Sequence, residues 1–183
     1  MQVSNSATQY GAMPKAFHWA TVLLVITSWL LGQLHDYLPH SMHAVGTSVH
    51  ISIGMTIFAL LVARLAWRFS DPPPPSEKTK FGPIAEIGAK GIHVVLYGLL
   101  LAIPIMGVVV QFARGHGLPV FGLFEFPSPW ARDRAFAKEM LEIHETMANA
   151  LMLLVGLHAA AALTHHYVLR DRTLRRMLPG AAH

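Results

Sequence analysis

Cysteine is absent from the 183 residues of this chain. Its absence excludes disulfides, thiolate metal sites, iron-sulfur clusters and the Cys-x-x-Cys-His attachment of c-type haem. Any haem here must therefore be held by coordination and packing alone. The chain has 12 histidines instead, and imidazole is the usual protein ligand of haem iron.

Charged residues are also scarce, at 13% of the sequence, while 53% of it is hydrophobic. Soluble domains carry about 25% charged residues, so this balance indicates that a lipid bilayer is the solvent. The formal net charge of +4 does not indicate a nucleic-acid partner. The basic residues are scattered through loops beside apolar runs and form no basic face.

Four apolar stretches are long enough to cross about 30 Å of hydrocarbon as helices. We expect one transmembrane domain over residues 1–183, with spans at about residues 17–34, 45–67, 91–112 and 143–169. The polar N-terminal residues show no signal-peptide pattern, so we expect the first span to be retained. Four consecutive prolines, Pro72–Pro75, predict an extended linker. The predicted fold class is all-α, an integral membrane four-helix bundle with a longer loop at about residues 113–140.

The orientation of the bundle follows from lysine and arginine, which concentrate on the cytoplasmic side of membrane proteins. The two sides of the predicted spans hold ten and four of these residues. The larger group is Lys15, Arg64, Arg68, Lys78, Lys80, Lys90, Arg170, Arg172, Arg175 and Arg176. The smaller group is Arg114, Arg132, Arg134 and Lys138. We therefore expect a bacterial inner-membrane protein with both termini in the cytoplasm.

Four histidines match in depth by pairs. His144 and His158 are 14 residues apart, which is about 21 Å along a helix and nearly four full turns, so both lie on one face of the fourth span. In the expected orientation His50 and His144 lie at a similar depth near the outer surface of the membrane. His18 and His158 lie at a similar depth near the inner surface. Each pair offers the two axial nitrogens of a six-coordinate haem iron. His144 and His158 are too far apart to share one zinc ion.

The other histidines have more than one interpretation. His93, also at the inner depth, is a candidate to replace His18 as a ligand or to hydrogen-bond a haem propionate or a quinone. His165 follows His158 on nearly the same face, as a quinone contact or an interfacial residue. We expect an interfacial position for His166 and surface positions for His35, His40, His43 and His183. Arg64 and Arg68 have two interpretations, propionate partners or positive-inside residues. Room for a porphyrin ring, or ordinary helix packing, would explain Gly46, Gly54, Gly98, Gly107 and Gly156.

Several motifs resemble those of the bacterial cytochrome b561 family, and in particular its superoxide oxidase members. These motifs are Phe17-His18-Trp19, Val49-His50-Ile51-Ser52, His93-Val94-Val95-Leu96-Tyr97, Glu142-Ile143-His144-Glu145-Thr146, Gly156-Leu157-His158-Ala159 and His165-His166-Tyr167. The resemblance implies a four-helix bundle with two b haems, superoxide as electron donor at the periplasmic face, and ubiquinone as acceptor. It also implies His18 with His158, and His50 with His144, as the ligand pairs.

The resemblance is weak in the loop between the third and fourth spans, which bears on the substrate. Arg114 and Lys138 are candidates to attract superoxide, because a local positive field draws anions. Acidic residues lie in the same stretch, so the summed charge of the loop does not decide whether superoxide is the substrate. Two other classes remain open, a cytochrome subunit that relays electrons from a partner protein to quinone and a haem-free transporter or scaffold.

Overall fold

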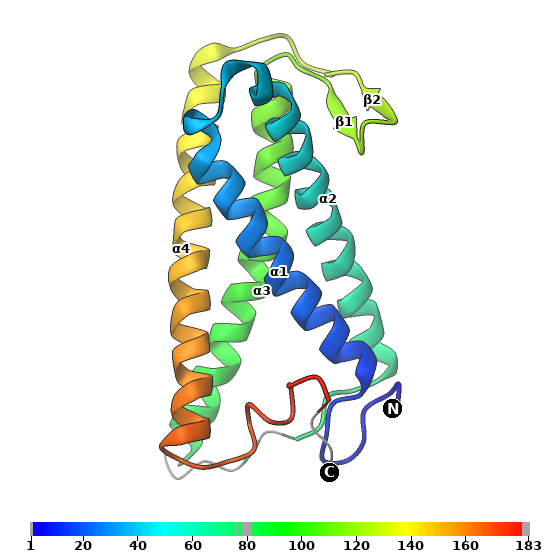
Figure 1. Ribbon diagram of the computed structural model, residues 1–183, viewed down its shortest axis with the longest axis vertical. Helices are drawn as coiled ribbons and strands as arrows, with labels where there is room; N and C mark the ends of the chain where they lie inside the picture. The colour runs from blue at the N-terminus through cyan, green and yellow to red at the C-terminus, as the bar shows by residue number, and fades with distance from the viewer. Residues whose placement is uncertain (1, 76, 78–81, 181–183) are drawn as a thin grey trace.

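The computed structural model describes residues 2–75, 77 and 82–180. Four long helices run along its length, α1 (Ala12–Leu34), α2 (His40–Ser70), α3 (Gly82–Ala113) and α4 (Arg134–Tyr167) (Figure 1). A single 3₁₀ turn, η1 (His35–Tyr37), joins α1 to α2, and strands β1 (Leu118–Val120) and β2 (Phe124–Phe126) form an antiparallel hairpin before α4. The predicted all-α bundle is confirmed. Lys78, Lys80 and His183 lie outside the described residues.

All four helices are long and apolar enough to cross a membrane. Large apolar side chains cover their outer surfaces, and Leu23, Val94 and Leu153 each expose about two thirds of their area. Such surfaces are unfavourable in water but suit a lipid solvent, in which every backbone polar group must be satisfied inside the helix. The outward apolar faces therefore support a transmembrane bundle.

The helices extend beyond the predicted ranges. His40 and His43, expected in a loop, form the first turn of α2. The expected loop at 113–140 is wrong over its last residues, because α4 begins at Arg134, where the Asp133 carboxylate accepts a hydrogen bond from Phe136 N at 3.0 Å. Apolar runs mark only the part of a helix inside hydrocarbon, whereas capping residues set where the helix begins.

Helix packing follows the chain order, with α1 against α2, α2 against α3 and α3 against α4. Side chains link α1 to α4, since Trp29 Nε1 donates to Asn149 Oδ1 at 2.9 Å. An apolar cluster built on Val25, Ile57 and Leu151 fills the middle of the bundle. Leu151 is midway along α4 between His144 and His158, so this cluster separates two histidine levels.

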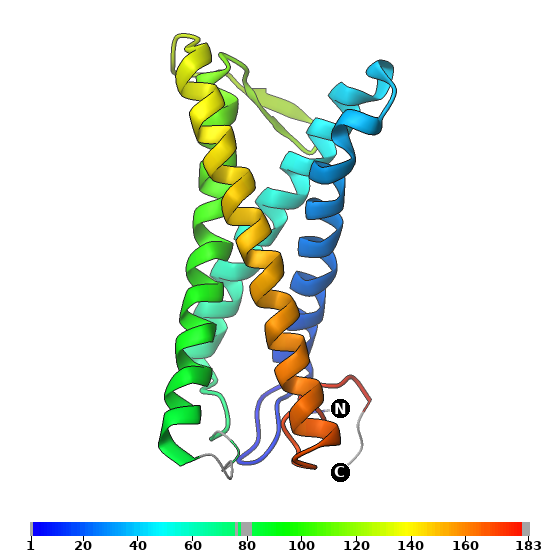
Figure 2. The same ribbon diagram turned by 90° about the vertical axis from the view of Figure 1, so that its left-hand side faces the viewer.

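The two ends of the bundle differ, as Figures 1 and 2 show. One end carries both termini and is called the terminal end. The other carries η1 and the β1–β2 hairpin and is called the hairpin end. Both termini lie at the same end because the chain runs the length of the bundle an even number of times.

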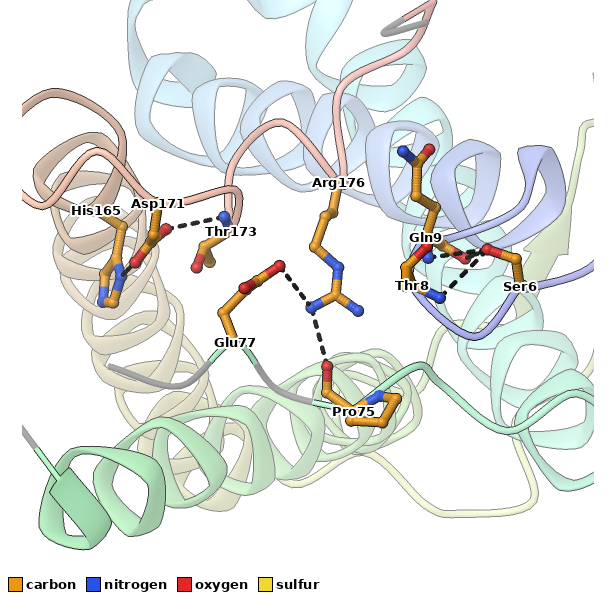
Figure 3. Close-up of polar contacts among 9 residues, drawn as sticks. All are labelled: Ser6, Thr8, Gln9, Pro75, Glu77, His165, Asp171, Thr173 and Arg176. Carbon is orange, nitrogen blue, oxygen red and sulfur yellow. Dashed lines mark hydrogen bonds and ion pairs between the residues drawn. The ribbon is translucent and has the colours of Figure 1, made fainter. Parts of the chain in front are cut away.

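The C-terminal tail and the linker after α2 fold together at the terminal end (Figure 3). Arg176 is 6% exposed, and its Nη1 donates to Pro75 O at 2.9 Å and lies 3.6 Å from a Glu77 carboxylate oxygen. Its guanidinium also stacks over the Tyr10 ring. Trp19 Nε1 of α1 donates to Met177 O at 2.9 Å. These contacts hold the tail against the end of the bundle.

Candidate functional site

His50 of α2 and His144 of α4 lie together near the hairpin end and form the hairpin-end pair. Their ring centroids are 6.1 Å apart, with an interplanar angle of 71°. His50 Nδ1 lies 3.0 Å from Ser28 O of α1, and His144 Nδ1 lies 3.1 Å from Ile103 O of α3. Because a carbonyl oxygen only accepts, Nδ1 carries the proton in each ring. Nε2 is then left as the metal-binding nitrogen, an arrangement typical of histidine ligands.

A glycine accompanies each of these two hydrogen bonds. Gly32 follows Ser28 by one helical turn, and Gly107 follows Ile103 by one turn. Gly32 therefore lies beside the carbonyl that His50 contacts, and Gly107 lies beside the carbonyl that His144 contacts. A Cβ at Gly107 would lie 3.3 Å from His144 Cε1, and one at Gly32 would lie 3.7 Å from His50 Cε1. At Gly107 above all, the missing side chain gives the ring room to reach the backbone.

Three histidines meet near the terminal end. The His18 and His158 rings, the terminal-end pair, have centroids 6.4 Å apart at an interplanar angle of 65°. His93 of α3 also packs against the His158 ring, and the two ring centroids are 5.3 Å apart. Its Nδ1 hydrogen-bonds to Ala89 O of its own helix at 2.5 Å. Arg64 packs over the Tyr97 ring, 5.3 Å from its centroid.

These separations test whether the rings can hold haem. A metal–imidazole bond is about 2 Å long and the nitrogen lies about 1 Å from its ring centroid, so two imidazoles on opposite sides of one iron have centroids roughly 6 Å apart. The hairpin-end pair and the His18–His158 pair fit this distance, whereas 5.3 Å for His93 is short. Within the described residues no three His, Asp or Glu side chains are grouped to hold a metal ion alone. Two imidazoles suffice for haem, because the porphyrin supplies the other four nitrogens.

A cavity of about 950 Å³ opens between the helices at the hairpin-end pair. His50 and His144 line it together with Gly54, and a Cβ at Gly54 would meet no atom within 4 Å. Its volume lies at the upper end of the range for ligand sites in proteins, about 300–1,000 Å³. The space beside the pair is therefore suited to a large flat ligand such as a porphyrin.

Basic side chains gather beside this cavity in a second pocket of about 440 Å³, here named the basic pocket. It is lined by Arg114, His116, Arg132, Arg134, Ala137, Lys138 and Leu141. No carboxylate lines it, although Glu142 lies 3.8 Å from Lys138. Arg114 lines both the basic pocket and the larger cavity. The two predicted anion-attracting residues, Arg114 and Lys138, are therefore brought to one pocket that shares a wall with the histidine cavity.

His165 lies at the terminal end of α4 and contacts Asp171 of the tail, with Nδ1 2.5 Å from Asp171 Oδ2 (Figure 3). Asp171 Oδ1 accepts a second hydrogen bond from Thr173 N at 2.9 Å. Partial burial raises the pKa of the Asp171 carboxyl, but the bonds from His165 and Thr173 outweigh this effect and hold the pKa below its usual range. Asp171 is therefore an anion at neutral pH.

The remaining histidines lie outside the two pairs. His35 and His40 pack against His43 at the hairpin end, with centroids 4.6 and 4.9 Å from it, and His35 also lines the cavity. His40 is exposed, as expected of a surface residue, whereas His35 and His43 are half-buried. His166 packs on the neighbouring Tyr167 ring.

Several residues that position these histidines were not predicted from the sequence. The carbonyls of Ser28 and Ile103 carry no side-chain signal, so their role could not be read from the sequence. Gly32 was available as a signal, because a glycine in an apolar helix indicates a close approach of another group. Asp171 follows the last span by a few residues, where only the folded tail brings it back to His165.

Comparison with known proteins places this architecture in a family. The sequence profile described as prokaryotic cytochrome b561 matches residues 9–180. The probable superoxide oxidase CybB of Yersinia pestis is 35% identical over 93% of this chain and 96% of its own length. Cytochrome b561 homolog 2 of Escherichia coli K12 is 33% identical over 97% of this chain and 95% of its own length. Cytochrome b562 of Cereibacter sphaeroides is 28% identical over 92% and 94%, respectively. The chain therefore belongs to the prokaryotic cytochrome b561 family and is a bacterial membrane protein that transfers electrons through haem b.

Proposed function

We propose that this protein is a superoxide:ubiquinone oxidoreductase with two haems b. His50 and His144 would hold one haem near the periplasmic side, and His18 and His158 would hold the other near the cytoplasmic side. The ring separations of 6.1 and 6.4 Å support this ligand assignment. Haem b supplies one-electron redox chemistry when bound, while the protein sets its ligands, burial and spacing.

The observation that carries the substrate assignment is the position of Arg114 in the wall between the basic pocket and the histidine cavity. An anion drawn into this pocket by Arg114 and Lys138 comes next to the cavity of the hairpin-end pair. Superoxide is a small anion, and a positive field raises its local concentration and its rate of encounter. The name of the Yersinia pestis relative agrees with this substrate.

The overall reaction balances as follows. Two superoxide anions each lose one electron and become molecular oxygen. One ubiquinone gains the two electrons and two protons and becomes ubiquinol. Both protons are taken up at the terminal end, where His165 and His93 are the candidate quinone contacts.

The proposed orientation places the terminal end in the cytoplasm and the hairpin end in the periplasm. The ten-to-four distribution of lysine and arginine supports it. Superoxide is then consumed outside the inner membrane, and quinol forms toward the inside. Labelling of single cysteines introduced at the exposed positions Ala7 and Leu123 with an impermeant reagent in intact spheroplasts tests this topology. Only the Leu123 site should react.

The activity is tested by mixing superoxide with the purified haem-loaded protein and following haem reduction by stopped-flow absorbance. Arg114→Gln and Lys138→Gln should each lower the second-order rate constant several-fold and weaken its dependence on ionic strength, because surface charges steer anions at low salt. Arg175→Gln removes an exposed charge at the opposite end and serves as the matched control. Slow haem reduction in the wild type, together with stable co-purification of a dehydrogenase, would favour the electron-relay subunit instead.

A further inference from the structure

The contact between His165 and Asp171 joins the last turn of α4 to the tail that follows it. His165 Nδ1 and Asp171 Oδ2 are 2.5 Å apart, and Asp171 N also donates to His165 O at 3.1 Å. Both side chains are largely enclosed, with 24% and 18% of their area exposed. Within the described residues, His165 makes no other side-chain hydrogen bond. The contact therefore defines the orientation of this imidazole.

We propose that Asp171 is a positioning residue that holds His165 in the tautomer and orientation needed to protonate a bound quinone. This inference rests on the proposed function, because it assigns the quinone to the terminal end. Asp171 does not touch the quinone. It acts only through the imidazole.

The chemistry follows from what each atom can do. The Asp171 carboxylate only accepts hydrogen bonds, so His165 Nδ1 carries a proton and Nε2 is the nitrogen that exchanges protons. When His165 is an imidazolium, the neighbouring carboxylate stabilises its charge, as in other carboxylate–histidine pairs. In the transfer, the Nε2–H bond breaks and an O–H bond forms on the quinone oxygen. The bound haems would supply the two electrons, and water at the terminal end protonates Nε2 again before the second transfer.

Within the described residues, the ion-pair partner of His165 is Asp171. Asp171 Oδ1 accepts a hydrogen bond from Thr173 N, and Glu77 and Arg176 form a separate ion pair (Figure 3). Thr173 contributes no charge, and Glu77 is already paired with Arg176. The negative charge that faces His165 is therefore that of Asp171.

The test uses full-length, haem-loaded Asp171→Asn protein. Its side-chain oxygen can keep the Thr173 bond while the negative charge is lost, and Glu77→Gln is the matched control that removes a carboxylate from the same end without touching His165. With ubiquinone-1 as the acceptor under anaerobic conditions, Asp171→Asn should slow re-oxidation of the reduced haems at least about tenfold at saturating quinone. KM for ubiquinone-1 should stay within about twofold, because positioning alters the transfer and not the binding.

Three further readouts separate this role from a structural one. Asp171→Glu should restore part of the rate. Haem spectra and midpoint potentials should match the wild type, and Asp171→Asn should cause no further loss in a His165→Gln background.

A wild-type re-oxidation rate in Asp171→Asn would overturn the inference while leaving the proposed function intact. Additive losses in the double variant would also overturn it, because Asp171 would then act independently of His165. If ubiquinone-1 fails to re-oxidise even the wild-type haems, both the proposed function and this inference are contradicted. Reduction by superoxide, measured separately without quinone, shows whether the donor half of the reaction still holds.

Discussion

The Nδ1 hydrogen of His144 on α4 is donated to the carbonyl oxygen of Ile103 on α3, over 3.1 Å. The region of α3 around Pro104 thus orients a side chain of its neighbour. His50 has the same relationship with Ser28 of α1. Each imidazole of the hairpin-end pair is oriented by a different helix, so all four helices contribute to one site.

Removing one ring of this pair should remove one haem. In His144→Ala we expect the haem content per chain to fall by about half, because a six-coordinate iron loses an axial ligand that packing alone does not replace. The pyridine haemochrome assay on purified protein measures the content. His43→Ala, which removes a histidine outside both pairs, should keep the wild-type value, and an undiminished content in His144→Ala would contradict the assignment.

The terminal end offers a sharper comparison between His18 and His93. His18→Ala should lose the second haem, because its ring stands at the separation that one iron requires, whereas His93→Ala should keep it. The reduced-minus-oxidised visible spectrum of each variant decides between them. If His93→Ala loses the haem and His18→Ala retains it, His93 and not His18 is the ligand.

Gly107 should be intolerant of a side chain. A Cβ there would lie 3.3 Å from His144 Cε1, and a branched side chain would push the ring off the Ile103 carbonyl. Because such supporting contacts typically contribute about 10- to 100-fold to metal affinity, Gly107→Val should weaken haem retention at the hairpin end by at least about tenfold. Haem transfer to apomyoglobin measures the loss. Gly88→Val on the same helix, where a Cβ meets nothing within 4 Å, should transfer haem at the wild-type rate.

Arg176 should stabilise the folded tail. Arg176→Met leaves the Pro75 carbonyl and the Glu77 carboxylate without their buried donor. We expect a loss of about 2 kcal/mol, below the usual cost of breaking a fully buried pair because Glu77 is 31% exposed. Thermal unfolding in detergent and the rate of tail proteolysis measure the effect. Arg175→Met, at an exposed neighbouring position, is the control, and equal behaviour of the two variants would show that the Arg176 contacts contribute nothing.

Much of the arrangement could be predicted from spacing along single helices. The depth of His18, His50, His144 and His158 follows from rise per residue and the direction of each span. The same reasoning placed His93 at the right level but could not tell that it packs against His158, because depth says nothing about rotation of one helix against another. Arg114 and Lys138 were identified by charge alone, and their shared pocket depends on the fold of the loop before α4.

The amino-acid sequence by itself determined the membrane class, the number of long helices and the levels of the histidines, because apolar length and helical rise are local properties. Only the tertiary structure decided which carbonyl orients each imidazole. It also decided that Arg114 lines both the basic pocket and the histidine cavity, and that Asp171 contacts His165. These relationships join residues on different helices or across a turn of the tail. They depend on how the helices rotate and pack, which no single segment encodes.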